Sequence, residues 1–385
     1  MVLSLTACSG NTGSSAGGQA SENASSSTDV DEAKSTDEET SEGADADAEK
    51  SGTVSVTCLN GSGEEIQVEV PYDAQRVVAV DFANLDILDN LGLGDRIVGA
   101  PNITLDYLQA YGENDDIVNV GTVKTPDLEA VMSCRPDIIF MAGRAAEYYD
   151  ALTEIAPVVR LISDTNLGLV ETVRKNATTI ASIFGKEDQV SQLLAQYDSR
   201  IESLAALAEG KTALVGMCTT GSFNLLGNDG RCSLIVNEIG FDNIGADAAT
   251  AGSSRSGGRG GENSGRGGED GESSSEDTGE SRESQDESQE GSDSGSTPTH
   301  GNEASFELVL SLNPDYIFVM DRDAAIATNG AQMAQEIMEN ELVMKTDAYQ
   351  NGNLIILDHP GVWYTGEGGI TALDYMLSDL ENALQ

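Results

Sequence analysis

The sequence predicts an α/β fold made of two Rossmann-like lobes joined by a long rigid helix. Short apolar strands alternate with amphipathic helices on both sides of a helical stretch, which is typical of parallel sheets covered by helices. One strand-and-arginine pattern occurs in both halves of the chain, which indicates that the second lobe repeats the first. We expect the N-terminal lobe at residues 53–165, connecting helices at 166–209 and the C-terminal lobe at 210–385.

The elements of the N-terminal lobe follow from its apolar runs. Residues 54–58 and 66–70 alternate in polarity around a glycine-containing turn at 60–63, so they predict a β-hairpin. Buried strands are predicted where short apolar runs stand between amphipathic segments, at residues 77–82, 97–100, 118–121, 137–143 and 158–161.

The connecting segment is predicted to be helical over residues 168–209, with one interruption at 184–186. Its second part has apolar residues at helical spacing and ends at Gly210. This part extends about 35 Å at about 1.5 Å per residue, enough to run along both lobes and to restrict their relative motion. The alternation then resumes, with strands at 212–218, 222–227, 316–321 and 354–358 and helices from Cys232, over 306–312, over 331–344 and from Ile370.

The repeated pattern places one arginine in each lobe. Residues 129–144 and 307–322 share a glutamate, a Pro-Asp pair and an arginine at the same offsets. In open α/β sheets, ligands bind outside the carboxyl ends of the strands. We therefore predict that Arg144 and Arg322 lie in a shared cleft. The alternative is that each arginine makes a surface ion pair, and that the repeat is the trace of an old gene duplication without a present function.

Composition separates the lobes from two acidic segments. The 385 residues include 66 Asp and Glu against 20 Lys and Arg, a net charge of −46, so the surface repels nucleic acid. Residues 9–52 and 248–299 have almost no large apolar side chains and are predicted to be disordered. We interpret the first as a tether and the second as a solvated insertion, although its Arg-Gly pairs are also found in RNA-binding tracts.

The N-terminus has the form of a shortened lipoprotein signal. Residues 5–8 read LTAC, an apolar residue and two small residues before a cysteine, while the basic and apolar regions of a full signal are absent from residues 1–8. We predict that Cys8 is lipidated and anchors the protein at the extracellular face of the cell membrane, unless LTAC is a chance match. Export makes the other cysteines possible disulfide partners in any of three pairings, namely Cys58, Cys134, Cys218 and Cys232.

Several motifs together resemble a known family. LTAC, VGTVKTPDLEAV, RPDIIFMAGR, HGNEASFE, NPDYIFVMDRDAA and LDHPGVWYTGEGG resemble the class III substrate-binding proteins of ABC importers, in the branch that handles petrobactin-like and other catecholate ferric siderophores. The resemblance covers residues 53–385 apart from the insertion. It implies a class III periplasmic-binding-protein fold and a monomer that is no enzyme, has no intrinsic cofactor, and delivers a ferric siderophore to a permease.

The resemblance also implies individual roles. Arg144, Arg231 and Arg322 match the family's cleft arginines, and His300 and Tyr364 match its ligands to the iron of the chelate. Guanidinium is suited to an anionic catecholate, since it is permanently charged and donates in a planar fork or stacks on a ring. Ferric iron is a hard cation that accepts phenolate and imidazole.

Three further residues complete the predicted set. Glu129 and Glu307 match the glutamates that dock to permease arginines, although an acid in the first turn of a helix also stabilises the helix dipole. Trp363, the one tryptophan, is expected to contact the ligand and to report its binding by fluorescence quenching. The second histidine, His359, is interpreted as a polar surface residue.

Other functions fit the sequence less well. A zinc or manganese binder needs several histidines, and the chain has 2. Cobalamin and haem binders share the fold but do not need three cleft arginines. An exported hydrolase needs a nucleophile elbow, and no G-x-S-x-G occurs. An acidic surface spacer explains the tails but not the repeated strand-arginine units.

Overall fold

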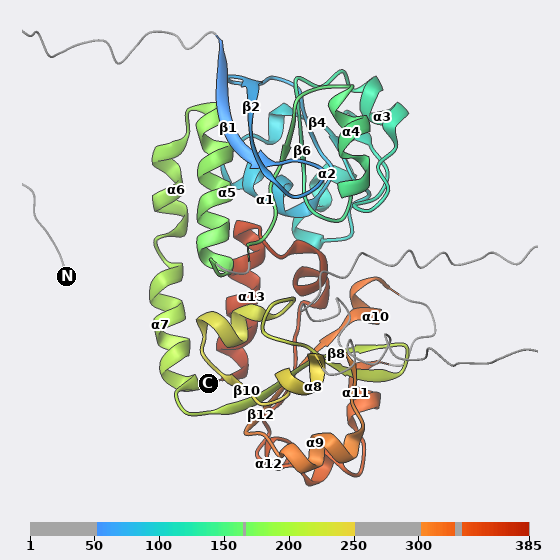
Figure 1. Cartoon of the computed structure of the whole chain (residues 1–385), viewed down its shortest axis with the longest axis vertical. Helices are drawn as coiled ribbons and strands as arrows, with labels where there is room; N and C mark the ends of the chain where they lie inside the picture. The colour runs from blue at the N-terminus through green and yellow to red at the C-terminus, as the bar shows by residue number, and fades with distance from the viewer. Residues whose placement is uncertain (1–51, 165–166, 251–301, 328–332, 385) are drawn as a thin grey trace, which may run out of the picture. The chain divides into compact units, whose positions relative to one another are not determined.

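A computed structural model describes residues 52–164, 167–250, 302–327 and 333–384 (Figure 1). The predicted lipobox with Cys8, the predicted tether up to residue 51 and His300 lie outside the described residues. Most of the predicted insertion does too, but residues 248–250 belong to helix α8 (Ala246–Thr250).

The N-terminal lobe is built on one sheet. Over its described residues the strand order is β2-β1-β7-β6-β3-β4-β5, in which β3 to β7 are parallel and β1 and β2 form the predicted hairpin. Every residue of β3, β6 and β7 is buried, as expected for central parallel strands covered by helices. The strands are β1 (Thr53–Leu59), β2 (Glu65–Pro71), β3 (Val77–Ala79), β4 (Ile97–Ala100), β5 (Val118–Asn119), β6 (Ile138–Met141) and β7 (Val158–Arg160).

The C-terminal lobe has a mixed sheet. Its described strands are β8 (Thr212–Thr219), β9 (Ser222–Leu225), β10 (Asp242–Asn243), β11 (Asn302–Glu303), β12 (Tyr316–Asp321) and β13 (Leu354–Ile356). The strands β10 and β12 pair in parallel with β8, and β13 pairs in parallel with β12, but β9 returns antiparallel to β8. Thr220 and Gly221 have φ of 50° and 81°, and two such residues make the tight turn of a hairpin. Two α/β lobes with parallel strands confirm the predicted fold class.

Helices fill the connections. They include α1 (Phe82–Asn90), α2 (Gln109–Gly112), α3 (Leu128–Ser133), α4 (Tyr149–Thr153), α9 (Phe306–Leu312), α10 (Arg322–Ala325), α11 (Ala334–Met338), α12 (Asp347–Gln350) and α13 (Ile370–Ala383). Two short π-helical turns stand beside them, η4 (Leu234–Glu238) and η7 (Val362–Gly366). The turn η7 contacts both α1 of the N-terminal lobe and α10 of the C-terminal lobe, so it lies where the lobes meet.

The repeated Pro-Asp pair has one structural role in both lobes. Asp137 accepts hydrogen bonds of 2.9 Å from the N–H groups of Gln75 and Arg76, just before β3. Asp315 accepts a bond of the same length from the N–H of Thr212, at the start of β8. Each aspartate therefore ties the start of its own strand, which the repeated arginine follows, to the start of the neighbouring strand.

The connecting segment consists of α5 (Leu169–Phe184), α6 (Glu187–Leu194) and α7 (Tyr197–Ala208), which run along both lobes in Figure 1. The predicted interruption is present, and Gly185 there has a φ of 64°. The prediction of one continuous second helix is wrong, because Ala195 and Gln196 form a turn. Both residues keep right-handed helical backbone angles, but the hydrogen bond from Arg200 N to Gln196 O is lengthened to 3.4 Å. The helical hydrogen bonding is therefore weaker at this turn, while the chain continues in the same direction.

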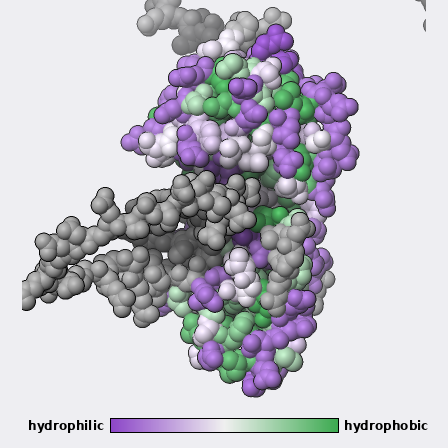
Figure 2. All heavy atoms as spheres, turned by 90° about the vertical axis from the view of Figure 1, so that its right-hand side faces the viewer, coloured by the Kyte–Doolittle hydropathy of each residue, from purple (hydrophilic) through white to green (hydrophobic). Residues whose placement is uncertain are grey.

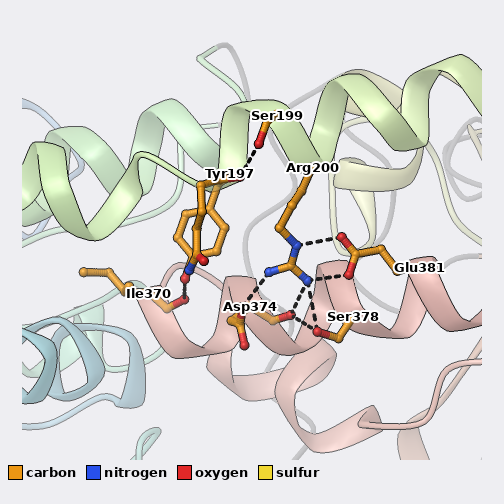
Figure 3. A network of polar contacts seen from close by, with 8 residues as sticks. Tyr197, Ser199, Arg200, Ile370, Asp374, Ser378 and Glu381 are labelled. Atoms are coloured by element: carbon orange, nitrogen blue, oxygen red, sulfur yellow. Dashed lines mark hydrogen bonds and ion pairs between the residues drawn. The ribbon is translucent and has the colours of Figure 1, made fainter. Parts of the chain in front are cut away.

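Arg200 fastens α7 to α13 (Figure 3). Its guanidinium donates to both carboxylate oxygens of Glu381, at 2.6 and 2.8 Å, and also reaches Asp374 and the hydroxyl of Ser378. One turn earlier, the hydroxyl of Tyr197 donates to the carbonyl of Ile370 at 3.1 Å. The last helix is thus bonded along its length to the connecting segment.

We expect Arg200→Ala to lower the free energy of unfolding by about 1–2 kcal/mol, a value set by its charged hydrogen bonds and reduced by partial solvent screening. Urea denaturation of the purified protein measures it. Ser199→Ala, on the same turn and exposed, is the control and should stay within about 0.5 kcal/mol of the wild type. Equal stability of the two variants would show that this network contributes nothing.

The start of α13 is bonded to the N-terminal lobe. Asp86 of α1 is fully buried and accepts the N–H groups of Thr371 and Ala372, at 3.0 and 2.9 Å. These are among the N–H groups that a helix leaves without internal partners at its first turn. A Cβ on Gly369 would lie 2.1 Å from a carboxylate oxygen of Asp86, so this position needs glycine. The bonded pair holds η7, which directly precedes α13, against α1.

The four described cysteines form no disulfide. Each is a free, buried thiol, and the four lie on different parts of the fold. Cys58 is on β1, Cys134 ends α3, Cys218 is on β8 and Cys232 precedes η4. Each cysteine packs in the apolar core beside its own strand or helix. The prediction that export makes them possible disulfide partners is therefore corrected, since the four thiols occupy separate core positions.

Candidate functional site

Three arginines from three separate elements converge on Tyr364 of η7. Arg144 follows β6 in the N-terminal lobe, Arg231 lies between β9 and η4, and Arg322 begins α10 directly after β12. The guanidinium carbons of Arg144, Arg231 and Arg322 lie 4.9, 4.5 and 5.8 Å from the centroid of the Tyr364 ring. Figure 2 shows hydrophilic and hydrophobic residues side by side on the surfaces of both lobes. The arginines of the repeat therefore meet where the lobes meet, together with a third that the repeat does not contain.

Hydrogen bonds hold the arginines to Tyr364. Arg144 donates from Nη2 to the Tyr364 carbonyl, and Arg231 donates from Nε to the same oxygen at 3.5 Å. Arg322 donates from Nε to the Tyr364 hydroxyl at 3.3 Å. The three side chains are half-buried, whereas Tyr364 is 5 % exposed. Each of the three arginines therefore keeps part of its surface accessible to solvent.

The cluster changes the acidity of its own members. Burial raises the pKa of Tyr364, but the hydrogen bond from Arg322 and the charges of Arg231, Arg322 and Arg144 outweigh it, so the pKa lies below its ordinary value. The pKa of Arg231 is lowered by burial and by the neighbouring charge of Arg144. Both shifts indicate concentrated positive potential, which is the reverse of the charge of the whole chain.

Asp323 holds Arg322 in place. It is 3 % exposed and lies 3.4 Å from Nη1 of Arg322. It also accepts the N–H of Thr220 at 2.7 Å, which ties the β8–β9 turn to α10. Thr219 completes the arrangement by accepting from Nη1 of Arg322 at 3.2 Å. Asp323 and Thr219 were not predicted from the sequence, although an acid directly beside a predicted cleft arginine was a usable signal.

Two glutamates stand beside the arginines and were also missed. Glu367 follows η7, and burial raises its pKa to about 7, while Arg231 and Arg144 lower it and Glu238 raises it. Glu238 of η4 accepts the N–H of Val170 at 2.8 Å, so it caps the first turn of α5. No sequence pattern marks either glutamate, because the two come together only through the packing of η4, η7 and α5.

Trp363 is not part of the exposed site. Its side chain is fully buried, and its Nε1 donates to Asp379 of α13 at 2.8 Å. Asp379 also accepts the N–H of His359 and contacts Nδ1 of that histidine at 2.6 Å. The predicted ligand contact of Trp363 is thus corrected to a core position. Trp363 and Tyr364 are consecutive residues of η7, but only the side chain of Tyr364 faces the arginines.

The remaining predicted residues are not gathered at this site. Glu129 and Glu307 are exposed in the first turns of α3 and α9. His300 lies outside the described residues. Within the ranges that the structure covers, no group of three or more His, Cys, Asp or Glu side chains is arranged to hold a metal ion. No helix in those ranges has the length and apolarity to cross a membrane.

The arrangement has the chemistry to attract an anion with flat, delocalised faces. Three fixed positive charges supply the attraction, and guanidinium groups can stack on aromatic rings as well as donate hydrogen bonds. Because the three arginines come from both lobes, a ligand that contacts all of them bridges the lobes.

Comparisons with known proteins match most of the described fold. The periplasmic binding protein family matches residues 77–259 and 289–360. The petrobactin-binding protein YclQ of Bacillus subtilis is 30% identical over 319 residues, which cover 82% of this chain and 84% of that protein. Its crystal structure has a TM-score of 0.67 to this chain, at 28% identity, and the match covers 86% of this chain and 99% of that one.

A second relative is the ferric-anguibactin-binding protein FatB of Vibrio anguillarum. It is 24% identical over 325 residues, covering 83% of this chain and 85% of that protein. Both matches span the two lobes, so the similarity concerns the whole fold and not a single motif. With the family match extending over more than half of the sequence, the chain belongs to the periplasmic binding protein family.

Proposed function

We propose that this protein captures an anionic ferric siderophore of the catecholate type between its lobes and delivers it to an ABC permease for iron uptake. The observation that carries the proposal is the convergence of Arg144, Arg231 and Arg322 on one aromatic residue at the lobe junction. The similarity to a petrobactin-binding protein over most of both chains supports it. The protein acts by binding, without catalysis and without a cofactor of its own.

The chemistry of the ligand matches the site. A ferric tris-catecholate spreads negative charge over planar aromatic oxygens, and a chain with a net charge of −46 would repel it everywhere else. Cobalamin and haem do not present this distribution of charge. In a chelate that leaves iron positions open, the phenol of Tyr364 is proposed as one ligand and His300 as another, since phenolate and imidazole suit ferric iron.

The test is a titration of the purified protein with a ferric tris-catecholate, haem and cobalamin, followed by visible absorbance and by Trp363 fluorescence. We expect saturable binding of the catecholate, with the lowest Kd of the three. Tighter binding of haem or cobalamin would contradict the proposal. Fluorescence is a useful signal even for a buried indole, because Trp363 directly precedes Tyr364 and reports changes in η7.

Anchoring and docking complete the proposed route. Lipidated Cys8 holds the protein at the extracellular face of the membrane, and residues 9–52 act as its tether. Glu129 and Glu307, one exposed acid on each lobe, engage basic residues of the permease. We propose that the protein acts as a monomer, so that both glutamates are free to dock.

We expect the double variant Glu129→Lys/Glu307→Lys to bind the ferric chelate with wild-type affinity but to support little iron uptake in cells. The charge reversal places like charges across the docking surface and leaves the cleft untouched. Radioactive iron uptake and a Kd measurement separate the two effects. Glu154→Lys/Glu339→Lys, at exposed positions on the same two lobes, is the control. Normal uptake by the first double variant would exclude docking through these residues.

A further inference from the structure

The side chain of Tyr364 lies in the middle of the arginine cluster. The guanidinium carbons of Arg144 and Arg231 stand 4.9 and 4.5 Å from the centroid of its ring, and that of Arg322 stands 5.8 Å from it. Distances below about 6 Å are those of an attractive contact between a cation and an aromatic ring. Tyr364 is 5 % exposed, so the cluster encloses it almost completely. The place where a planar anion would meet all three charges is therefore held by the protein itself.

Tyr364 offers the arginines the groups that an aromatic anion would offer. Its carbonyl accepts hydrogen bonds from Arg144 and Arg231, and its hydroxyl accepts one from Arg322 at 3.3 Å. A catecholate likewise presents an aromatic ring with oxygen acceptors, and its oxygens are charged. Three like charges this close repel one another, and the contacts with the ring and the oxygens offset part of that repulsion. Tyr364 thus supplies from within the chain the contacts that a bound aromatic anion would supply.

The backbone around Tyr364 is fixed on both sides. Before it, Trp363 donates to the buried Asp379 at 2.8 Å. After it, a Cβ on Gly366 would lie only 3.0 Å from the hydroxyl of Tyr107, and the start of α13 is bonded to α1. A shift of the whole of η7 would break these contacts, whereas a rotation of the Tyr364 side chain breaks none of them. The ring can therefore leave the arginines while the carbonyl of the same residue stays in place.

We propose that the Tyr364 side chain is a plug in the binding site, whose ring holds the three guanidiniums together and must turn outward before an anionic ferric chelate can reach them. The inference rests on the proposed function. In a tris-catecholate the chelator fills every coordination position of the iron, so the phenol gains no bond to iron in exchange for the contacts that it loses. The apparent affinity for such a chelate is reduced by the fraction of molecules in which the ring has turned outward.

The first test compares the wild type with Tyr364→Ala in the binding of a ferric tris-catecholate by isothermal titration. The variant keeps the backbone carbonyl and the net charge, but it lacks the ring and the hydroxyl that compete with the ligand. We expect its Kd to be roughly 5- to 30-fold lower than that of the wild type, because the competing cation–π contacts are gone. Tyr364→Phe keeps the ring and loses only the bond from Arg322, so its Kd should lie between the two. A folded Tyr364→Ala protein that binds no more tightly than the wild type overturns the plug.

Tyr349→Ala is the matched control. It removes a partly buried tyrosine from α12 of the C-terminal lobe and should keep the wild-type Kd. Far-UV circular dichroism establishes that each variant is folded. An equal gain in affinity for Tyr349→Ala and Tyr364→Ala would mean that loosening of the lobe, and not release of the arginines, strengthens binding, and the plug would be wrong.

A crystal structure of the wild type with a ferric tris-catecholate tests the plug without any variant. We expect the ring of Tyr364 to have turned away, with each of the three guanidinium carbons more than about 6 Å from its centroid. Trp363 should still donate to Asp379, since the backbone of η7 stays in place. A ring that remains among the arginines while the chelate is bound overturns the inference, whatever the Kd values of the variants.

The outcomes separate this inference from the proposed function. If neither the wild type nor Tyr364→Ala binds any anionic ferric chelate, the proposed function fails, and the inference fails with it. If the wild type binds the chelate with the ring of Tyr364 still among the arginines, and Tyr364→Ala binds it no more tightly, capture stands and the plug is wrong.

Discussion

Replacing Asp86 with alanine is expected to lower the free energy of unfolding by about 2–4 kcal/mol, because it leaves buried donors without partners. The N–H groups of Thr371 and Ala372 lose their acceptor, and the amide of Asn90 loses one of its hydrogen bonds, the one of 2.6 Å to the Asp86 carboxylate. Urea denaturation followed by far-UV circular dichroism measures the loss. The variant should also bind ligand more weakly, since η7 depends on the same contacts.

Asp95→Ala is the matched control for this change. Asp95 stands on the same lobe, but its side chain is 81% exposed, so its removal should change stability by no more than about 0.5 kcal/mol. If Asp86→Ala were as stable as Asp95→Ala, the bond between α1 and α13 would have no energetic importance.

Arg322→Ala is expected to weaken binding of a ferric tris-catecholate by about 1.5–3 kcal/mol, or roughly 10- to 150-fold in Kd. The variant removes a half-buried charge and the bond to the Tyr364 hydroxyl, but leaves Asp323 to hold the β8–β9 turn. Isothermal titration measures the Kd, and raising the salt concentration should reduce the difference only modestly because the site is partly buried. The same loss is expected for Arg144→Ala, from the other lobe.

Arg174→Ala provides the comparison at equal net charge. Arg174 lies on α5 and pairs with Glu171 and Asp198 at the surface, so its loss changes the total charge without changing the cleft. A similar weakening by Arg174→Ala and Arg322→Ala would mean that long-range charge, and not the convergence at Tyr364, governs affinity.

The repeat made the fold and part of the site predictable. Pro-Asp and arginine at equal offsets in two strand units imply equal geometry at two sheet edges, and the structure gives Asp137 and Asp315 the same role at those edges. That symmetry explains why Arg144 and Arg322 both lie near one residue, Tyr364. Arg231 and Tyr364 stand outside the repeat, so only the resemblance to a family pointed to them.

Other features depend on packing that local patterns do not encode. The helical spacing of 186–209 continues through Ala195 and Gln196, so periodicity gave no sign of the turn there. Trp363 and Tyr364 are adjacent aromatic residues, and which of them faces the cleft is decided by the acceptor that Asp379 offers to the indole. Glu367 was missed for the same reason, since the charges that act on it come from residues far away in the sequence.

The bond between α1 and α13 has a consequence for the order in which the molecule is assembled. Asp86 and Thr371 are 285 residues apart in the chain, so the part of α1 that packs against α13 stays uncovered until both sheets have been synthesised. Contacts between such distant residues form late and slow the search for the native state. The N-terminal lobe is therefore expected to complete its interior only after release of the full chain, and a fragment ending before η7 should expose that surface and aggregate.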